Sequence, residues 1–335
     1  MENEKIDFVI LWVDGNDENW RKEKEKYEQN TNTSEENIDK REIRYRDWDN
    51  LQYWFRGIEK FAPWVNKIHF ITCGHLPKWL NTNHPKLHIV KHLDYMPKDC
   101  LPTFNSNAIE LLIHKIEGLE EKFVLFNDDL FITKKVKPTD FFKKGKPCNT
   151  MAFTSIIPIA NQKHYKTVSN NMEIINRNFN FKQSVKRNFG KYVSLKQRRY
   201  ILKTYPLFIY NKFVGFSNFH LPLSYLKTTF KEVWSKEESI LNDTIHSRFR
   251  NYEQNVNHWL FNYWQFASGN FHQKSLKFGI NILINDKKVP TLIRRQKYKV
   301  LGLGDSEQIE NFEEVKRKII ENFEKILPEK SNYEQ

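Results

Sequence analysis

A nearly uninterrupted apolar run close to the start of the chain most restricts what the sequence can fold into. Residues 6–13 read IDFVILWV, and the polar residues Asp14, Gly15, Asn16 and Asp17 follow directly. A strand with one face in water alternates apolar and polar side chains, whereas a parallel strand covered on both faces reads as a continuous apolar run. We therefore predict a buried parallel strand that ends in a polar turn, where glycine gives the backbone extra freedom.

Helical and strand patterns alternate along the residues that follow. Apolar residues at helical spacing predict a helix over residues 48–61, and a second helix begins at a cap formed by Asn105 or Ser106 and ends at Gly118. Short apolar runs predict further strands over residues 67–73, 87–92 and 123–126. This order predicts an α/β fold, with a mostly parallel sheet and flanking crossover helices.

Two of the predicted strands end in acidic residues. The first strand is followed by Asp14, and residues 123–132, FVLFNDDLFI, place Asn127, Asp128 and Asp129 directly after an apolar run. Ligands of such sheets bind beyond the carboxyl ends of the strands. The two acidic turns are therefore expected to share a site.

The composition limits the class of protein and its surroundings. The chain has 335 residues, 39% of them apolar, with 54 Lys and Arg against 41 Asp and Glu, a net charge of +13. This is enough apolar material for a core, and the charge favours anionic partners, although a merely soluble basic surface explains it equally well. Cys73, Cys100 and Cys148 form neither a disulfide framework nor a zinc pattern, which fits a reducing compartment. With no signal sequence and no transmembrane run, we expect a cytoplasmic protein that can also rest on the inner face of a membrane.

Three segments differ in character along the chain. Residues 1–155 are read as the N-terminal half of the catalytic core, residues 156–212 as a basic, mostly helical insertion or lid, and residues 213–335 as the C-terminal half. Between residues 163 and 204, eleven Lys and Arg accompany a single acid and interleaved aromatic residues. That pattern is typical either of a surface that tracks a polyanion or of a solvated basic helix pair.

Two further segments are predicted from their pattern. Residues 27–45 are polar and are predicted to form a mobile loop. Residues 305–327 are predicted to form an amphipathic helix that is capped by Asp305 or Ser306 and stopped by Pro328.

The acidic turn fits a divalent cation. Mg²⁺ and Mn²⁺ prefer carboxylate oxygens and often take substrate phosphates as further ligands. Neighbouring residues on a strand point to opposite faces, so Asp128 and Asp129 serve one ion only where the strand has already ended. An ordinary polar turn remains the alternative, and the sequence has neither of the common glycine-rich phosphate-binding motifs.

Other polar residues leave their roles open. His114 lies four residues after Glu110, which predicts either an oriented acid–base pair or a simple surface pair. His220, before Leu221 and Pro222, is either a catalytic base or a core histidine bonded to backbone. Arg250, with Arg248 beside it, either clamps a phosphate or is simply exposed.

Long blocks of the sequence resemble the Stealth family. They are IDFVILWVDGND, RDWDNLQYWFRGIEKFAPWVNKIHFITCGHLPKWLN, LPTFNSNAIELLIHKIEGLEEKFVLFNDDLFI and, more loosely, NFHLP and FRNYEQNVNHWLFNYW. The resemblance covers residues 1–135 densely and residues 215–265 loosely. It implies a Rossmann-like fold of the nucleotide-sugar-transferase type and a sugar-1-phosphate transferase. The donor is then a UDP-sugar, the acceptor is a hydroxyl of a capsular or cell-surface polysaccharide, and UMP is released.

The resemblance also implies a role for each matched residue. His220 becomes the general base, and Arg250 stabilises charge on the phosphoryl group. Asp128 and Asp129 are then the ligands of a Mg²⁺ or Mn²⁺ ion that also binds the diphosphate. Asp128 is in addition expected to be a catalytic residue. The substrate pocket is expected to include Asp14, Gly15, Asn105, His114 and Asn127.

Two alternative functions stay open from the sequence. A metal-dependent glycosyltransferase would use the same donor and a similar acidic site but would release UDP. A basic nucleic-acid-binding protein would explain the charge and the 15% aromatic content, but it leaves the acidic strand ends unexplained. We therefore expect a UDP-sugar and a polysaccharide, itself anionic if it carries phosphodiesters, as partners, and no nucleic acid.

Overall fold

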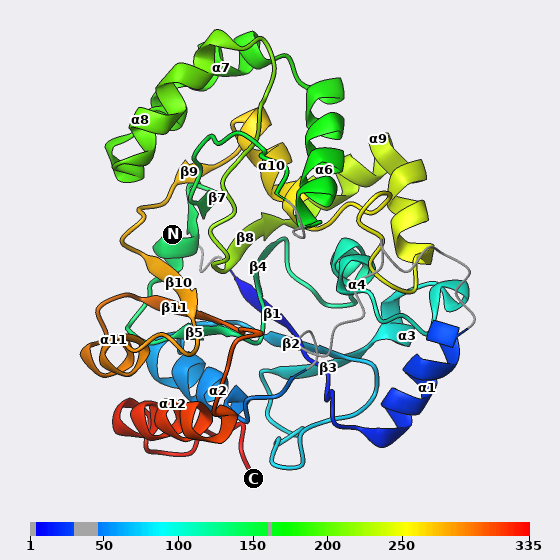
Figure 1. Ribbon diagram of the computed structural model, residues 1–335, viewed down its shortest axis with the longest axis vertical. Coiled ribbons are helices and arrows are strands. Elements are labelled where there is room, and N and C mark those ends of the chain that lie inside the picture. Colours follow the sequence, from blue (N-terminus) through cyan, green and yellow to red (C-terminus); the bar gives the residue numbers. More distant parts are fainter. Residues whose placement is uncertain (1–4, 30–45, 160–162) are drawn as a thin grey trace.

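A five-stranded sheet forms the centre of the computed structural model, which describes residues 5–29, 46–159 and 163–335 (Figure 1). The strand order is β3-β2-β1-β4-β8. The first four strands are parallel, and β8 is antiparallel to β4. The strands are β1 (Asp7–Leu11), β2 (Ile68–Thr72), β3 (Leu87–Lys91), β4 (Lys122–Phe126) and β8 (Leu223–Leu226). The predicted mostly parallel sheet is thus confirmed.

Side chains alternate between two cores, one on each face of this sheet. Phe8 and Ile10 of β1 belong to one core and Val9 belongs to the other, as the two-residue period of a strand requires. The first core includes α2 (Leu51–Phe61) and α12 (Phe312–Ile326). The second includes α4 (Ser106–Leu111), α9 (Lys227–His246) and α10 (Trp259–Ser268). Both faces are covered, which explains why β1 is apolar without interruption.

A second sheet extends the fold beyond β4. β5 (Leu130–Ile132) follows β4 after a short turn and pairs antiparallel with β11 (Val300–Gly304), which pairs parallel with β10 (Gly279–Leu283). α11 (Val289–Arg295) connects β10 and β11. A Cβ atom on Gly57 of α2 would lie 2.7 Å from the carbonyl oxygen of Ile132, so only glycine allows α2 to approach β5 this closely.

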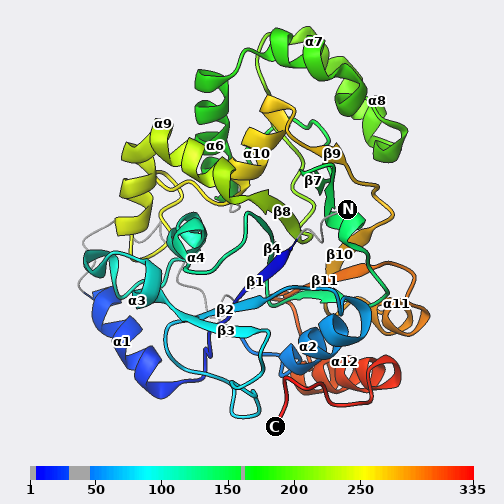
Figure 2. The same ribbon diagram turned by 180° about the vertical axis from the view of Figure 1, so that it is seen from behind.

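A helical region projects from one end of the molecule, and two views from opposite sides agree on its place (Figures 1 and 2). It contains α6 (His164–Asn178), α7 (Phe181–Tyr192) and α8 (Tyr200–Thr204), with 3₁₀ turns at Leu195–Gln197 and Tyr205–Ile209. The predicted basic helical insertion is thus confirmed as helical. A small sheet comprises β6 (Phe142–Lys143), β7 (Lys146–Asn149) and β9 (His272–Gln273). Its strands β7 and β9 lie between α7 and the central sheet (Figure 1).

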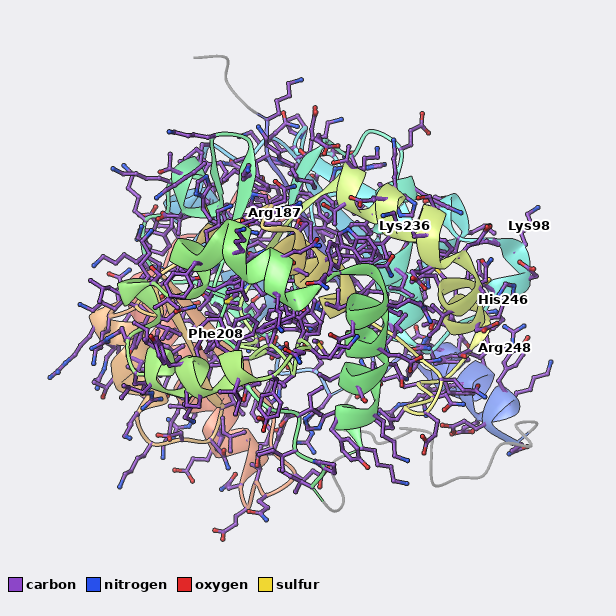
Figure 3. All side chains as sticks on the ribbon, turned by 90° about the horizontal axis from the view of Figure 1, so that it is seen from above. Lys98, Arg187, Phe208, Lys236, His246 and Arg248 are labelled. Atoms are coloured by element: carbon purple, nitrogen blue, oxygen red, sulfur yellow. The ribbon has the colours of Figure 1, made fainter. Side chains whose placement is uncertain are left out.

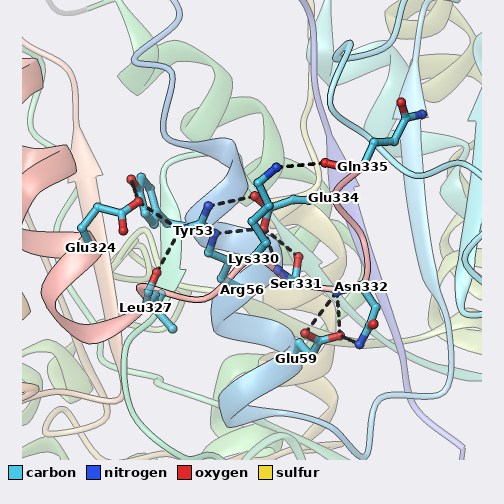
Figure 4. A network of polar contacts seen from close by, with 10 residues as sticks. All are labelled: Tyr53, Arg56, Glu59, Glu324, Leu327, Lys330, Ser331, Asn332, Glu334 and Gln335. Atoms are coloured by element: carbon cyan, nitrogen blue, oxygen red, sulfur yellow. Dashed lines mark hydrogen bonds and ion pairs between the residues drawn. The ribbon is translucent and has the colours of Figure 1, made fainter.

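The last residues of the chain join α12 to α2 through a polar network (Figure 4). Nε and Nη2 of the Arg56 guanidinium donate to Oε1 and Oε2 of Glu334, each at 2.9 Å. Arg56 also donates to Glu324 at 3.0 Å and to the Leu327 carbonyl at 2.9 Å. The side chains of Arg56 and Glu334 are only 8% and 3% exposed, so this is a buried, bidentate ion pair.

Two predicted helix boundaries are wrong. Helix α12 is capped by Asn311, whose side chain accepts from the backbone of Glu314 at 3.0 Å, and not by Asp305 or Ser306. The predicted helix from Asn105 to Gly118 is interrupted at Leu112 and continues as a 3₁₀ turn.

The predicted loop over residues 27–45 is wrong where the structure describes it. Residues 27–29 complete helix α1 (Glu18–Gln29), and the rest of that segment lies outside the described residues. Among the helices of the described ranges, none is both long enough and apolar enough to cross a membrane.

Candidate functional site

A pocket of about 810 Å³ opens at the carboxyl ends of β1, β2 and β4. The strand order changes direction between β1 and β4, because β2 and β3 extend the sheet to one side and β4 and β8 to the other. Such a switch point leaves a crevice in which α/β proteins bind their ligands. The pocket draws residues from widely separated parts of the chain, including Trp12, Asp47, Glu110, Asp128, His220, Arg250 and Asp305.

The acidic turn after β4 faces this pocket. The strand ends at Phe126, and the backbone NH of Leu130 donates to the carbonyl of Asn127 at 3.1 Å, which closes the turn. Since the strand ends before both acids, the alternation of a strand no longer separates them. Asn127, Asp128 and Asp129 all line the pocket, as the sequence analysis anticipated for residues that share one site.

The side chain of Asp128 lines the pocket and is exposed to solvent there. The protein atoms around the pocket partly desolvate its carboxylate and raise the pKa of Asp128 to about 7, with the nearby charges of Asp129 and Asp47 adding to the effect. A positive charge bound beside Asp128 would lower its pKa and favour loss of this proton.

Asp128→Asn is expected to stabilise the folded chain, and the gain should increase with pH. An aspartate carboxyl ordinarily has a pKa of 3.8, whereas the pKa of Asp128 in the folded chain is about 7. The folded wild type therefore binds this proton more tightly than the unfolded chain and loses stability as pH rises between those two values. Asparagine does not titrate. Thermal unfolding of both proteins in chelator at pH 5, 6, 7 and 8 measures the difference, and a difference that shrinks toward pH 8 would contradict the assignment.

His220 is paired with Asp129. The Nε2 atom of His220 lies 2.8 Å from Oδ2 of Asp129. Burial lowers the pKa of His220, but the charge and hydrogen bond of Asp129 outweigh it and hold the pKa above 6.5. An ionised carboxylate only accepts, so Nε2 carries the hydrogen and Nδ1 is left as the free base. His220 has a φ of +43°, a strained left-handed conformation for a residue other than glycine.

Two further aspartates, Asp47 and Asp305, line the same pocket, although the sequence pattern predicts neither as a site residue. The pKa of Asp47 is raised by burial and by the charges of Asp49 and Asp14, although a hydrogen bond from the Asp49 backbone opposes this. Asp305 accepts from Arg46 at 3.1 Å. Asp47 lies in the segment RDWDN, which belongs to the blocks that carry the family resemblance, so this resemblance is the signal that could identify it. The pattern around Asp305 predicts a helix cap instead.

Acids outnumber bases in the pocket wall. Its acidic residues are Asp47, Glu110, Asp128, Asp129, Asp305 and Glu307, whereas its lysine and arginine residues are Arg46 and Arg250. Oδ1 of Asp129 and Oδ2 of Asp305 are buried, and neither has a hydrogen-bond partner within the described part of the chain. Unpartnered carboxylate oxygens in an acidic pocket are the donor set that a hard divalent cation takes.

Arg250 reaches the pocket from the loop after α9. Its guanidinium donates to the Ser106 hydroxyl at 2.6 Å, at the start of α4. Asn105 caps α4 through its side-chain oxygen and donates from Nδ2 to the Ser247 carbonyl at 2.9 Å and to Asn255 Oδ1 at 3.0 Å. Asn105 is buried and does not belong to the pocket wall; it ties the start of α4 to the loop that carries Arg250.

His114 lies elsewhere, in the apolar core beside Phe230 and Trp234. Burial lowers the pKa of His114 to about 4. The expected surface pair of Glu110 and His114 is wrong, because both side chains are buried and Glu110 contacts Nδ1 of His258 at 2.5 Å. Glu110 lines the pocket and His114 does not.

Asp14 and Gly15 form a turn at the end of β1, beside the pocket wall. The backbone NH of Asp14 donates to His75 at 2.8 Å, and the Gly15 carbonyl accepts from Arg21 at 2.5 Å. The pocket wall is formed nearby by Trp12 and Val13, without Asp14 or Gly15. The charge of Asp14 still acts on Asp47.

A second group of side chains that could hold a metal ion lies outside this wall. Asp99, Cys100 and His246 place one ligand atom each within 4.8 Å of one another. Asp99 and His246 are exposed. The group shares no residue with the pocket.

The early part of the chain matches two family models. The model described as Stealth protein CR1, conserved region 1, matches residues 4–31, and the one described as Stealth protein CR2, conserved region 2, matches residues 44–149. The capsular polysaccharide phosphotransferase WcwK of Streptococcus pneumoniae is 46% identical over 334 residues, which cover 99% of this chain and 98% of that protein. The chain belongs to the Stealth family. The resemblance seen in the sequence is thereby confirmed.

Other relatives match over nearly their full length. The receptor polysaccharide phosphotransferase WefC of Streptococcus gordonii is 40% identical, with 99% of each chain covered. The exopolysaccharide phosphotransferase cps2G of Lactiplantibacillus plantarum is 34% identical over 98% of this chain and 96% of that protein. Among solved structures, the galactosyltransferase LgtC aligns with a TM-score of 0.38 at 10% identity, over 94% of this chain and 95% of that chain.

The two Stealth regions contain only part of the candidate site. They include Asp47 and the turn from Asn127 to Asp129, whereas His220 and Arg250 lie beyond residue 149. The fold brings both residues back to the pocket. His220 shortly precedes β8, which pairs with β4, and Arg250 is held by its hydrogen bond to Ser106.

Proposed function

We propose that this chain transfers a sugar-1-phosphate from a UDP-sugar to a hydroxyl of a capsular or cell-surface polysaccharide and releases UMP. One observation carries the proposal: His220, Arg250, Asp128 and Asp129 come from distant parts of the chain and line one pocket. The names of the relatives support a phosphotransferase that acts on a polysaccharide.

The proposed reaction is a substitution at phosphorus. The acceptor oxygen bonds to the phosphorus that carries the sugar, and the bond from that phosphorus to the oxygen bridging the two phosphates breaks, so that UMP leaves. The bond between the sugar carbon and its oxygen stays intact, which retains the anomeric configuration. Such a transfer needs positioning and charge neutralisation more than a covalent intermediate.

His220 is proposed as the general base. Asp129 accepts a hydrogen bond from the Nε2–H group of His220 and thereby orients the imidazole. The free Nδ1 then takes the proton of the acceptor hydroxyl. Arg250 would stabilise the charge that develops on the phosphoryl oxygens. Ser106 holds the Arg250 guanidinium at the pocket wall.

Asp128 and Asp129 are proposed to hold Mg²⁺ or Mn²⁺, with Asp47 and Asp305 beside them. The excess of acids in the wall would repel a diphosphate, so an anionic donor needs a cation there. A bound divalent cation would neutralise phosphate charge and help UMP to leave. Asn127, Asp14 and Gly15 remain proposed contacts of the donor, and Asn105 is proposed to position the Arg250 loop. His114, in the apolar core, is proposed only to support α4.

The proposal also covers location and chain organisation. All three cysteines are free, which is compatible with the proposed cytoplasmic enzyme that can also rest on the inner face of the membrane. Residues 1–155 and 213–335 would form the two halves of the catalytic core, and residues 156–212 the basic helical insertion between them.

Purified protein incubated with a UDP-N-acetylhexosamine, Mg²⁺ and capsular oligosaccharide is expected to release UMP. The product should carry a phosphodiester signal in phosphorus NMR, because the phosphate stays with the sugar. Nucleotides are separated by chromatography, and a reaction without oligosaccharide controls for donor hydrolysis. Release of UDP, with a glycosidic bond and no phosphodiester, would contradict the proposal and establish a glycosyltransferase instead.

A further inference from the structure

The projecting helical region bears an unusual outer surface. We call residues 181–212 the basic arm; it comprises α7, α8 and their two 3₁₀ turns, and it lies at the end of the molecule away from β2 and β3 (Figures 1 and 2). A view from above shows the arm lying across this end, with Arg187 and Phe208 labelled on it (Figure 3).

The inner side of the basic arm is anchored to the body. Tyr192 is fully buried, and its hydroxyl donates to the Phe266 carbonyl at 2.8 Å. Phe181 packs edge to face against Phe213, with ring centroids 5.0 Å apart, and also contacts Phe153. These contacts fix the orientation of the arm relative to the body, so the same side of the arm always faces outward.

The outer side exposes large apolar side chains. Of the ten that are exposed in the described part of the chain, six lie between Phe189 and Tyr210. The most exposed are Leu195 at 90%, Leu202 at 79% and Ile209 at 79%. Leu202, Tyr205 and Ile209 follow one another at intervals of three and four residues, which keeps them on one side of a helical segment. Apolar groups gathered in this way mark a surface that meets something other than water.

The same arm carries a dense positive charge. Residues 181–212 contain nine Lys and Arg and no Asp or Glu, and the nearest acids along the chain are Glu173 and Glu232. Most of these cations are exposed, including Lys186, Arg187 and Arg199. With no acid on the arm, its charges are not neutralised within it, so the surface attracts anions.

We propose that the basic arm docks the protein onto an anionic lipid bilayer. Leu195, Leu202 and Ile209 enter the boundary between headgroups and acyl chains, while the surrounding Lys and Arg side chains face lipid phosphates. Basic side chains with exposed apolar residues on a surface helix are the combination that binds in this way. A hydrated anionic polymer would neutralise the cations but would leave Leu195 and Leu202 in water, so the apolar residues favour the bilayer. The inference concerns binding alone and stands whichever bond the pocket breaks.

Vesicle sedimentation of the full chain tests this proposal. The protein is mixed with vesicles of phosphatidylcholine, with or without 30% phosphatidylglycerol, in 150 mM salt. Wild type is expected to bind the anionic vesicles at least tenfold more tightly than the neutral ones. The triple variant Leu195→Ser, Leu202→Ser, Ile209→Ser should lose at least tenfold in affinity at unchanged charge.

Matched variants distinguish binding through the basic arm from a general effect of the positive charge of the protein. Replacing Lys186, Arg187, Arg198 and Arg199 by glutamine should remove most of the preference for anionic vesicles. Replacing Lys287, Lys288, Arg294 and Arg295 of the α11 region by glutamine removes the same charge and should change binding less than twofold. Leu93→Ser is the corresponding apolar control. Circular dichroism checks that each variant is folded.

Hydrogen exchange locates the contact independently of any variant. Vesicles should slow exchange in peptides from residues 195–210 of the wild type and not in peptides from α11. The proposal is overturned if wild type fails to bind anionic vesicles, or if protection falls outside the arm. It is also overturned if the triple serine variant binds as wild type does, because the arm then recognises charge alone, as a polyanion-binding surface would.

Discussion

Replacing His220 by glutamine is expected to lower kcat by about 100- to 10,000-fold, the usual contribution of a general base. Glutamine keeps the polar character of the position but cannot take the proton of the acceptor hydroxyl. Steady-state rates at saturating donor and acceptor measure the loss. His246→Gln removes an exposed histidine outside the pocket and should leave kcat within twofold of wild type. A His220→Gln variant within threefold of wild type would eliminate this residue as the base.

The pH profile separates the role of Asp129 from that of His220. His220 must be neutral to act, so kcat/KM of the wild type should fall as pH drops through a pKa held above 6.5 by Asp129. In Asp129→Asn the carboxylate is gone, the pKa of His220 falls, and the acidic limb of the profile should move to lower pH. Saturating Mn²⁺ keeps weakened cation binding from mimicking this shift. An unmoved limb would show that Asp129 does not set the basicity of His220.

Arg56→Met is expected to lower the free energy of unfolding by about 3 to 5 kcal/mol, the usual consequence of removing one partner of a buried ion pair. The change leaves the Glu334 carboxylate, only 3% exposed, without its bidentate donor, and also removes the bond to the Leu327 carbonyl. Urea unfolding, followed by tryptophan fluorescence, measures the loss.

Two comparisons make the Arg56 result specific. Arg317→Met is the same substitution in the exposed pair with Glu321 on α12 and should cost no more than about 0.5 kcal/mol. The double variant Arg56→Met, Glu334→Gln should lose less free energy of unfolding than the sum of the two single variants. In the double variant, no buried charge is left without its partner. Additive costs would mean that the two residues do not act as a pair.

The fold was largely predictable because its signals are local. The apolar runs at residues 6–13, 67–73 and 87–92 each predict a strand, and the structure pairs these strands in one parallel sheet. β10 and β11 carried no comparable signal. Gly302 and Gly304 make β11 a poor strand by propensity, and it forms because β5 and β10 pair with it.

The candidate site was predictable only in part, because much of it depends on contacts between distant residues. Asp128 and His220 were picked out, and both line the pocket. Asp305 was read as a helix cap, since an acid before an amphipathic stripe has the same local pattern in either role. Asn105 and His114 lie within the matched block but point into the scaffold, because sequence similarity alone does not distinguish a pocket residue from the residues that support it.

The pairing of β5 with β11 has a consequence for how the enzyme is made. These strands are about 170 residues apart, and the acidic turn from Asn127 to Asp129 directly precedes β5. On the ribosome, the central sheet can form early, but the pocket wall stays incomplete until β11 and Asp305 have been synthesised. In a nascent chain, the acidic turn is therefore synthesised long before the pocket wall is complete. Activity should appear only near the end of synthesis, so interrupted chains would be inert.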